Sequence, residues 1–240
     1  MASLVEMIAR QAQQTFSRNF NEDVFVDCLA KLRIMLGHIK SSDVNLSRDI
    51  FKLTKDNSVE KSAPVTYVDL FENQIFSMGI FIVRNGARIP LHDHPGMYGL
   101  LKVLHGKVKI INYNRTNLNE KIGRIPREII HKIPTWQRHL LLPSKRNEDI
   151  EVSTDTEPCV LTPTEGNLHE IHSVGGIAAF LDILAPPYMN ETDCHYYQHV
   201  GDQDVNDKTK ISWLAEISSP TDFWCDSIPY TGPNINLDQG

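Results

Sequence analysis

The sequence predicts a mainly β protein in which a sandwich or barrel of short strands follows two N-terminal helices. Apolar residues recur at helical spacing before about residue 40, and segments rich in β-formers alternate with turns after residue 64. The 240 residues suit one such domain with extensions and can bury a sizeable core. We therefore expect a helical extension over residues 1–63 and a β domain over residues 64–240.

Charge and composition exclude several classes of partner. The formal net charge is −6 and the pI is near 5.9, so we expect no nucleic acid partner and no anionic membrane surface. The chain has no apolar run of the length that spans a bilayer, and residues 1–10 lack the apolar core of a signal peptide. The 4 cysteines show no C-x-x-C spacing, which favours a reducing, cytoplasmic location without a disulfide framework.

Two helices are predicted before the β region. Residues 3–19 place Leu4, Ile8 and Ala12 at helical spacing. Asn21 can cap a second helix that runs through about His38, because its side chain can accept a hydrogen bond from the first turn. Residues 40–63 are polar and irregular, and they predict a join between the helices and the β body.

Short strands are predicted from residue 65 onward, separated by turn residues. Their expected ranges are 65–70, 75–84, 98–104, 107–113, 158–163, 167–174, 177–184 and 194–200. Residues 114–150 contain a turn cluster, three prolines and a charged run, so we assign no element there.

Two histidines in the segment 86–106 are the strongest candidates for chemistry. His92 and His94 are two positions apart, so on an extended chain both rings point to one face and can bind one metal ion. Pro90 and Pro95 flank the pair and stiffen the backbone. The alternative is a polar turn with two surface histidines.

The spacing of glycines and histidines in this segment resembles the first motif of the cupin family. In most metal-binding cupins the position of Gly99 holds a glutamate that also binds the metal, whereas a histidine-only set is typical of thiol dioxygenases. The residues 90–97, Pro-Leu-His-Asp-His-Pro-Gly-Met, resemble cysteamine (2-aminoethanethiol) dioxygenases and plant cysteine oxidases. The resemblance implies a cupin double-stranded β-helix barrel over residues 64–240.

A third histidine comes from the segment 161–172, which resembles the second cupin motif, G-x-x-H. Gly166 and His169 fit that motif, and His172 is the competing candidate. Positions 169 and 172 point to opposite faces of a strand, so they cannot both enter one barrel. The spacing from Gly166 favours His169, and the resemblance therefore implies a metal site of His92, His94 and His169.

The resemblance extends from about Phe76 to the C-terminus. It includes the segments 175–188, 193–197 and 222–225. It implies one Fe(2+) per chain and O2 as co-substrate, with both oxygen atoms added to sulfur. The implied substrates are cysteamine, giving hypotaurine, and proteins or peptides with an N-terminal cysteine. In the latter, cysteine sulfinic acid would signal oxygen supply through an N-degron pathway.

A site of three neutral imidazoles suits a thiol substrate. It leaves a divalent ion its full positive charge, so that a thiol can lose its proton and bind as the thiolate. Gly99 is expected to leave space beside the ion. Iron fits better than zinc because zinc has no redox chemistry.

Four further residues are candidates for the substrate pocket. Asp182 lies in the apolar stretch 178–185, where it either meets the substrate amine or is bound by backbone or a lysine. Tyr188 either orients the substrate or packs after the Pro-Pro turn. Cys194 and Tyr196 share a face on a strand; the resemblance implies a thioether between them, and the alternative is ordinary packing.

Two other functions remain open at the level of sequence. One is a catalytically silent metal-binding cupin that acts as a ligand-binding or interaction module, although the full histidine set argues against a pure scaffold. The other is a zinc or manganese cupin isomerase or hydrolase, which the missing glutamate disfavours. We expect a monomer.

Overall fold

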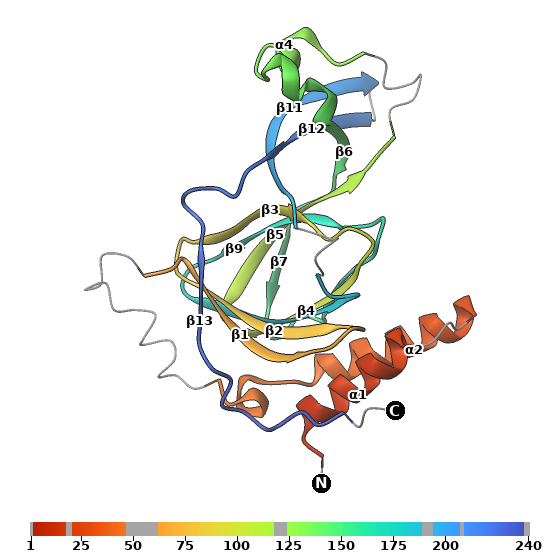
Figure 1. Ribbon diagram of the computed structural model, residues 1–240, viewed down its shortest axis with the longest axis vertical. Coiled ribbons are helices and arrows are strands. Elements are labelled where there is room, and N and C mark those ends of the chain that lie inside the picture. Colours follow the sequence, from red (N-terminus) through yellow and green to blue (C-terminus); the bar gives the residue numbers. More distant parts are fainter. Residues whose placement is uncertain are drawn as a thin grey trace.

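Two β-sheets face each other and enclose the interior of the molecule, while two helices pack beneath one of the sheets (Figure 1). The computed structural model describes residues 2–17, 21–46, 62–117, 124–188, 194–206 and 209–237. The predicted mainly β architecture with N-terminal helices is confirmed. The facing sheets have the double-stranded β-helix arrangement of a cupin barrel.

The N-terminal helices form where the apolar spacing predicts them. They are α1 (Leu4–Phe16) and α2 (Glu22–Gly37), followed by a single 3-10 turn, η1 (Ser41–Val44). Each α-helix begins with a side-chain cap, because Ser3 accepts a hydrogen bond from the Glu6 amide and Asn21 accepts one from the Val24 amide. Residues 18–19 and 47–61, which the sequence assigns to the first helix and to the irregular join, lie outside the described residues.

The six-stranded sheet carries the helices on its outer face. Its strands lie in the order β13 (Cys225–Ser227), β1 (Val65–Glu72), β2 (Ser77–Val83), β10 (Ala178–Ala185), β4 (Tyr98–His105) and β8 (Cys159–Leu161). Side chains alternate along β2: Met78, Ile80 and Ile82 pack toward the helices, and Ser77, Gly79 and Phe81 face the interior. One face of β2 therefore belongs to the core beside the helices, and the other face lines the space between the two sheets.

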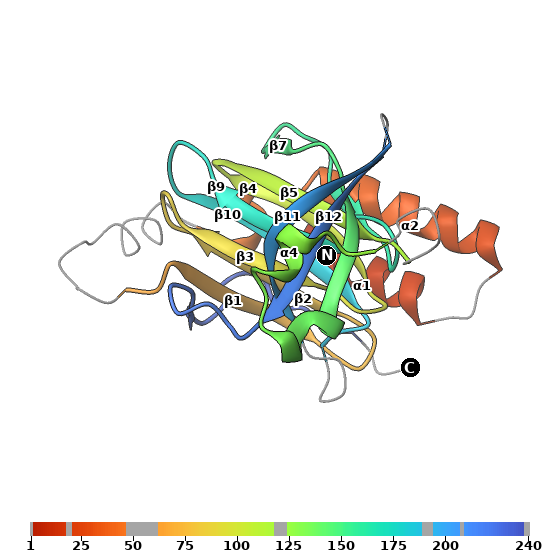
Figure 2. The same cartoon turned by 90° about the horizontal axis from the view of Figure 1, so that it is seen from above.

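The second sheet supplies the other wall of the interior. Its strands lie in the order β6 (Leu141–Arg146), β12 (Thr209–Ile217), β11 (Tyr196–Asn206), β3 (Arg88–Asp93), β9 (Leu168–Ser173), β5 (Lys107–Arg115) and β7 (Ile150–Ser153). Because β5 also pairs with β6, six of these strands close on themselves. In the view from above, β11, β12 and the short helix α4 (Arg127–Ile130) lie over the middle of the sandwich (Figure 2).

Several elements differ from the expectation. The expected strand ranges leave out the segment that holds His92, but residues 88–93 form the strand β3. Pro90 resembles a strand breaker in sequence, and the structure accommodates it because the pairing of β3 with β9 shifts register between Ile89 and His92. The unassigned stretch 114–150 contains α4, the 3-10 segment η2 (Thr135–Leu140), β6 and the start of β7. Two further strands near the C-terminus, β12 and β13, were also not predicted.

The apolar core has two main parts. One lies between the helices and the six-stranded sheet and contains Ile8, Leu36, Ile80 and Leu100. The other lies between the two sheets and contains Val103, Val108, Ile171 and Phe180. Within the described residues, no helix combines the length and the apolar character needed to cross a membrane.

Candidate metal centre

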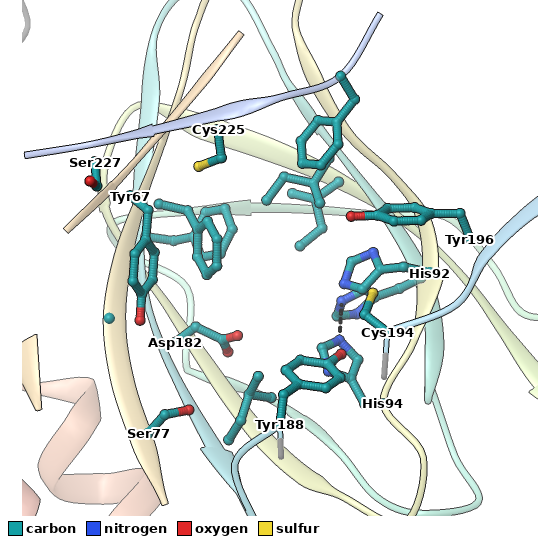
Figure 3. A pocket seen from close by; sticks show the side chains of 18 of the residues that line it. Tyr67, Ser77, His92, His94, Asp182, Tyr188, Cys194, Tyr196, Cys225 and Ser227 are labelled. Carbon is teal, nitrogen blue, oxygen red and sulfur yellow. Dashed lines mark hydrogen bonds between the residues drawn. The ribbon is translucent and has the colours of Figure 1, made fainter. Parts of the chain in front are cut away.

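Three buried histidines meet between the sheets (Figure 3). His92 and His169 stand directly opposite each other on the paired strands β3 and β9, and His94 follows the end of β3. One ring nitrogen from each of the three lies within 4.8 Å of the others, and the Nε2 atoms of His94 and His169 are 3.0 Å apart. The structure thus brings together the three residues that the sequence selects.

Hydrogen bonds orient two of the imidazole rings toward the centre. His92 donates from Nδ1 to the carbonyl oxygen of Pro90 at 2.7 Å. The Nδ1 of His94 lies 2.7 Å from the Tyr188 hydroxyl, which itself donates to the Asp93 carbonyl oxygen, so His94 acts as the donor to Tyr188. Both rings then present an unprotonated Nε2 to the centre, which is the tautomer that a metal ligand requires.

The geometry and the charge state of the cluster fit a metal ion. Two nitrogen ligands at about 2.1 Å from a metal and at right angles are about 3.0 Å apart, which is the separation of the His94 and His169 nitrogens. Burial lowers the pKa of His92, and it lowers the pKa values of His94 and His169 well below the usual range with help from the neighbouring rings. All three imidazoles are therefore neutral and available as ligands.

The competing histidine lies elsewhere. His172 points away from the cluster, and its Nε2 is 3.1 Å from the carboxylate of Glu170. Glu170 also pairs with Arg88 at 2.8 Å. The three-residue offset from His169 has placed His172 on the outer face of β9, as strand alternation requires.

A cavity of about 430 Å³ extends from the histidines between the sheets. Across it, on β10, β2 and β1, a polar wall is formed by Asp182, Ser77 and Tyr67 (Figure 3). Burial raises the pKa of Asp182 to about 7, and a hydrogen bond from the Ile183 backbone lowers it in part. Among the described residues no lysine or arginine pairs with Asp182, so the lysine partner considered from the sequence is not found.

Tyr188, Cys194 and Tyr196 border the same cavity beside the histidines (Figure 3). The Cys194 thiol lies within hydrogen-bonding reach of the hydroxyls of both Tyr188 and Tyr196. Burial raises the pKa of Cys194 to about 11. Burial also raises the pKa of Tyr188 well above the usual value for tyrosine, so the Tyr188 hydroxyl stays protonated. The ring of Tyr196 lies 6.5 Å from that of His92.

Asp93 is a supporting residue that the sequence reasoning missed. Its fully buried carboxylate accepts hydrogen bonds from Arg115, from the Tyr197 hydroxyl at 2.9 Å and from the His195 amide at 3.0 Å. Since Asp93 stands between His92 and His94 in the chain, this network holds the backbone that carries both. Its place between two candidate ligands was the available signal.

Asn167 holds the same segment from the other side. Its side-chain amide donates to the His94 carbonyl oxygen at 2.6 Å and to the Thr162 carbonyl oxygen at 3.1 Å. The position of His94 is therefore determined by contacts on both sides, in addition to the end of β3.

Leu161 takes the space directly beside Gly99. A Cβ atom at Gly99 would stand 2.8 Å from Cγ of Leu161 on the neighbouring strand β8. Gly99 nevertheless borders free volume near the centre, because it lines a cavity of about 170 Å³ together with Leu161 and His169.

Comparison with known proteins connects this site to one family. The PCO_ADO family model matches residues 35–235. The chain is 38% identical to the 2-aminoethanethiol dioxygenase of Mus musculus over 98% of this chain and 97% of that relative. It is 35% identical to the 2-aminoethanethiol dioxygenase of Homo sapiens with the same coverage. It is 31% identical to plant cysteine oxidase 1 of Arabidopsis thaliana over 79% of this chain and 65% of that relative.

Proposed function

Because this chain belongs to the PCO_ADO family, we propose that it is a non-haem iron enzyme that adds both atoms of O2 to the sulfur of cysteamine, of protein N-terminal cysteines, or of both. The chain is a thiol dioxygenase, as its curated relatives are. The iron and the choice of substrate are the parts that we propose. The products would be hypotaurine from cysteamine and cysteine sulfinic acid from an N-terminal cysteine.

One observation supports the proposal most strongly: three neutral histidines face a buried carboxyl group across a single cavity. A ferrous ion held by His92, His94 and His169 would supply the charge that binds a thiolate and the electrons that activate O2. Asp182 lies on the opposite wall, where it can interact with a second group of the substrate. An amine two carbons from a thiol matches this pair of sites.

Asp182 is proposed to bind the substrate amine. That amine is mostly protonated near neutral pH, and an ammonium in a buried cavity needs an acceptor. Asp182 has no competing cation among the described residues. Its pKa of about 7 allows the carboxylate either to hold the ammonium or to take a proton from it.

Tyr188 is proposed to orient the substrate and His94 together. Its hydroxyl is fixed by the Asp93 carbonyl oxygen and His94, while its side chain borders the cavity. A hydroxyl that stays protonated can still accept a hydrogen bond from the substrate.

A thioether between Cys194 and Tyr196 is a further proposal, supported by the contact between the thiol and the Tyr196 hydroxyl. The new bond would join the sulfur to a ring carbon beside the hydroxyl. The two hydrogen atoms that leave would be taken up by O2 as the oxidant. The intact protein would become lighter by the mass of two hydrogens, which mass spectrometry would detect.

The size of the cavity supports a peptide substrate as well as cysteamine. A volume of about 430 Å³ lies in the range of sites for larger ligands and exceeds what cysteamine needs. Its lining extends past Asp182 to Cys225, Asp226 and Ser227 on β13. The residues that follow an N-terminal cysteine could lie along that wall, and we propose that such oxidation signals oxygen supply through an N-degron pathway.

The proposal is tested by anaerobic reconstitution with ferrous iron followed by exposure to air. Mass spectrometry should show a gain of two oxygen atoms on cysteamine, on a peptide with N-terminal cysteine, or on both. A peptide that begins with serine is the matched control and should not change. If the protein binds iron and oxidises neither thiol, the dioxygenase proposal is wrong and a silent binding module replaces it.

We also propose a monomer in a reducing, cytoplasmic environment. All four cysteines are free in the structure, which is consistent with such an environment. Membership in this family does not favour the alternative of a catalytically silent metal-binding cupin that acts as a ligand-binding or interaction module.

A further inference from the structure

A second, smaller cavity reaches the histidine centre from the other side of β9 and β10. It has a volume of about 170 Å³ and shares His169 and Asp182 with the large cavity. The large cavity lies under β1, β2 and β3, whereas the small one lies between β4 and β8 on one sheet and β5 and β7 on the other. The centre is therefore open to two separate spaces within the barrel.

The walls of the small cavity suit a small apolar molecule. Its inner part is lined by the buried side chains of Leu101, Ile110 and Leu161. Its polar lining residues are Glu165, Asn112, whose side chain binds Asn147, and His169 and Asp182 at the end shared with the large cavity. The volume holds only a few molecules of water size, about 30 Å³ each, and apolar cavities of similar volume stay dry and bind xenon.

We propose that the small cavity is the route by which O2 reaches the histidine centre, separate from the route of the thiol. This inference rests on the proposed function. A peptide substrate with its sulfur at the histidines, its amine at Asp182 and its following residues along β13 occupies the large cavity on that side of the centre. O2 that arrives after the substrate then needs another path, and the small cavity with its inner wall of Leu101, Ile110 and Leu161 offers it.

Ile150 and Leu161 control the two ends of this route. Ile150 is 40% exposed and pairs with Ile110 across β7 and β5, so both side chains lie on the face that lines the cavity. Leu161 lies against Gly99 at the buried inner part. A larger side chain at position 150 should narrow the outer end without disturbing the buried core.

The kinetic test uses Ile150→Trp in the iron-loaded enzyme. We expect kcat/KM for O2 to fall several-fold while kcat/KM for the thiol at saturating O2 stays the same. Ile34→Trp on α2 is the matched control, because Ile34 is 60% exposed and does not line either cavity. The control should leave both parameters unchanged.

Xenon provides a second measurement that does not depend on activity. In the zinc-loaded protein under xenon pressure, the methyl resonances of Leu101, Ile110 and Leu161 should shift, and the shifts should weaken in Ile150→Trp. An unchanged kcat/KM for O2 in Ile150→Trp overturns the proposal, even if xenon binds. Absence of any O2 consumption by the wild-type enzyme with either thiol would instead contradict the proposed function.

Discussion

At the scale of single residues, Asp182 is the group whose chemistry depends most on its surroundings. It lies on an apolar strand and faces the cavity, and its pKa of about 7 results mainly from burial. A buried carboxyl group without a cationic partner destabilises the fold when it ionises. Such a group is retained where a ligand supplies the missing positive charge, which is the role that we propose for the substrate amine.

Substitution Asp182→Asn preserves the shape of the side chain and removes its charge. If the amine is held as an ammonium, loss of the charged acceptor should cost about 1.5–3 kcal/mol, or about one to two decades in kcat/KM for cysteamine. The comparison is with propane-1-thiol, which has the same length as cysteamine and a methyl group in place of the amine. Equal losses for both thiols, or none for either, would mean that the amine is bound elsewhere.

The same substitution should change how stability depends on pH. The folded pKa of about 7 lies above the value of about 3.9 in the unfolded chain, so the carboxyl group stabilises the fold at low pH and this contribution is lost as pH rises through about 7. In the metal-free protein, the Tm of Asp182→Asn minus that of the wild type should therefore increase between about pH 5 and about pH 8. A difference independent of pH would show that Asp182 does not titrate in this range.

The three histidines should be required for metal binding, and His172 should not. Alanine at position 92, 94 or 169 removes one nitrogen of a three-nitrogen site and should leave the purified protein with little bound metal. His172→Ala loses only a partly exposed ion pair with Glu170 and should retain the metal. Metal analysis by mass spectrometry checks both, and a loss of metal only in His172→Ala would reverse the assignment.

At the scale of elements, β3 is the strand that positions the metal centre. Its register shift at Pro90 turns His92 toward His169, and its C-terminal end is held by β11 through the pairing of His92 with Tyr196. The buried carboxylate of Asp93 then connects the end of β3 to β5 and β11 through Arg115 and Tyr197. The ligand geometry thus depends on β11, which is paired with β3, and on β5, which lies beyond β9 in the same sheet.

Substitution Asp93→Asn should weaken metal binding although Asp93 contacts no metal. The neutral side chain loses the ion pair with Arg115, so the backbone between His92 and His94 is held less firmly. We expect the metal affinity to fall by about 10–100-fold, measured by competition with a chelator. Asp202→Asn is the matched control. Asp202 on β11 also binds several side chains, His199 on β11 and Ser212 and Lys210 on β12, but it lies away from the metal centre. An unchanged affinity in Asp93→Asn would exclude the positioning role.

At the scale of the whole molecule, the helices and the six-stranded sheet share one apolar core. Leu32 and Leu36 of α2 and Ile8 of α1 are fully buried in the cluster that contains Ile80 and Leu100. The division into residues 1–63 and 64–240 remains a prediction, but the shared core favours unfolding in one step.

The helices should therefore contribute to global stability. Leu36→Ala should reduce the free energy of unfolding by about 2–5 kcal/mol because it leaves a cavity in the shared core. Val26→Ala on the same helix, where the side chain is 55% exposed, should change it by less than about 0.5 kcal/mol. Urea unfolding measured by circular dichroism and by tryptophan fluorescence should give one coincident transition, and two separate transitions would show that the helices fold independently.

The sequence by itself determined the features that depend on local periodicity. The helices, most strands of the barrel and the common orientation of His92 and His94 follow from spacings of a few residues. The choice of His169 over His172 followed from the alternation of side chains along a single strand together with a family motif. The resemblance of these motifs to the family was confirmed by the comparisons.

Only the tertiary structure decided what surrounds the histidines. The polar wall at Asp182, the network around Asp93 and the leucine beside Gly99 each join segments that lie far apart in the chain. Local spacing predicts to which face of a strand a side chain points, but it does not predict which strand lies opposite that face. That pairing is set by the closure of the two sheets around a shared core, and the cavities are the volume that this closure leaves unfilled.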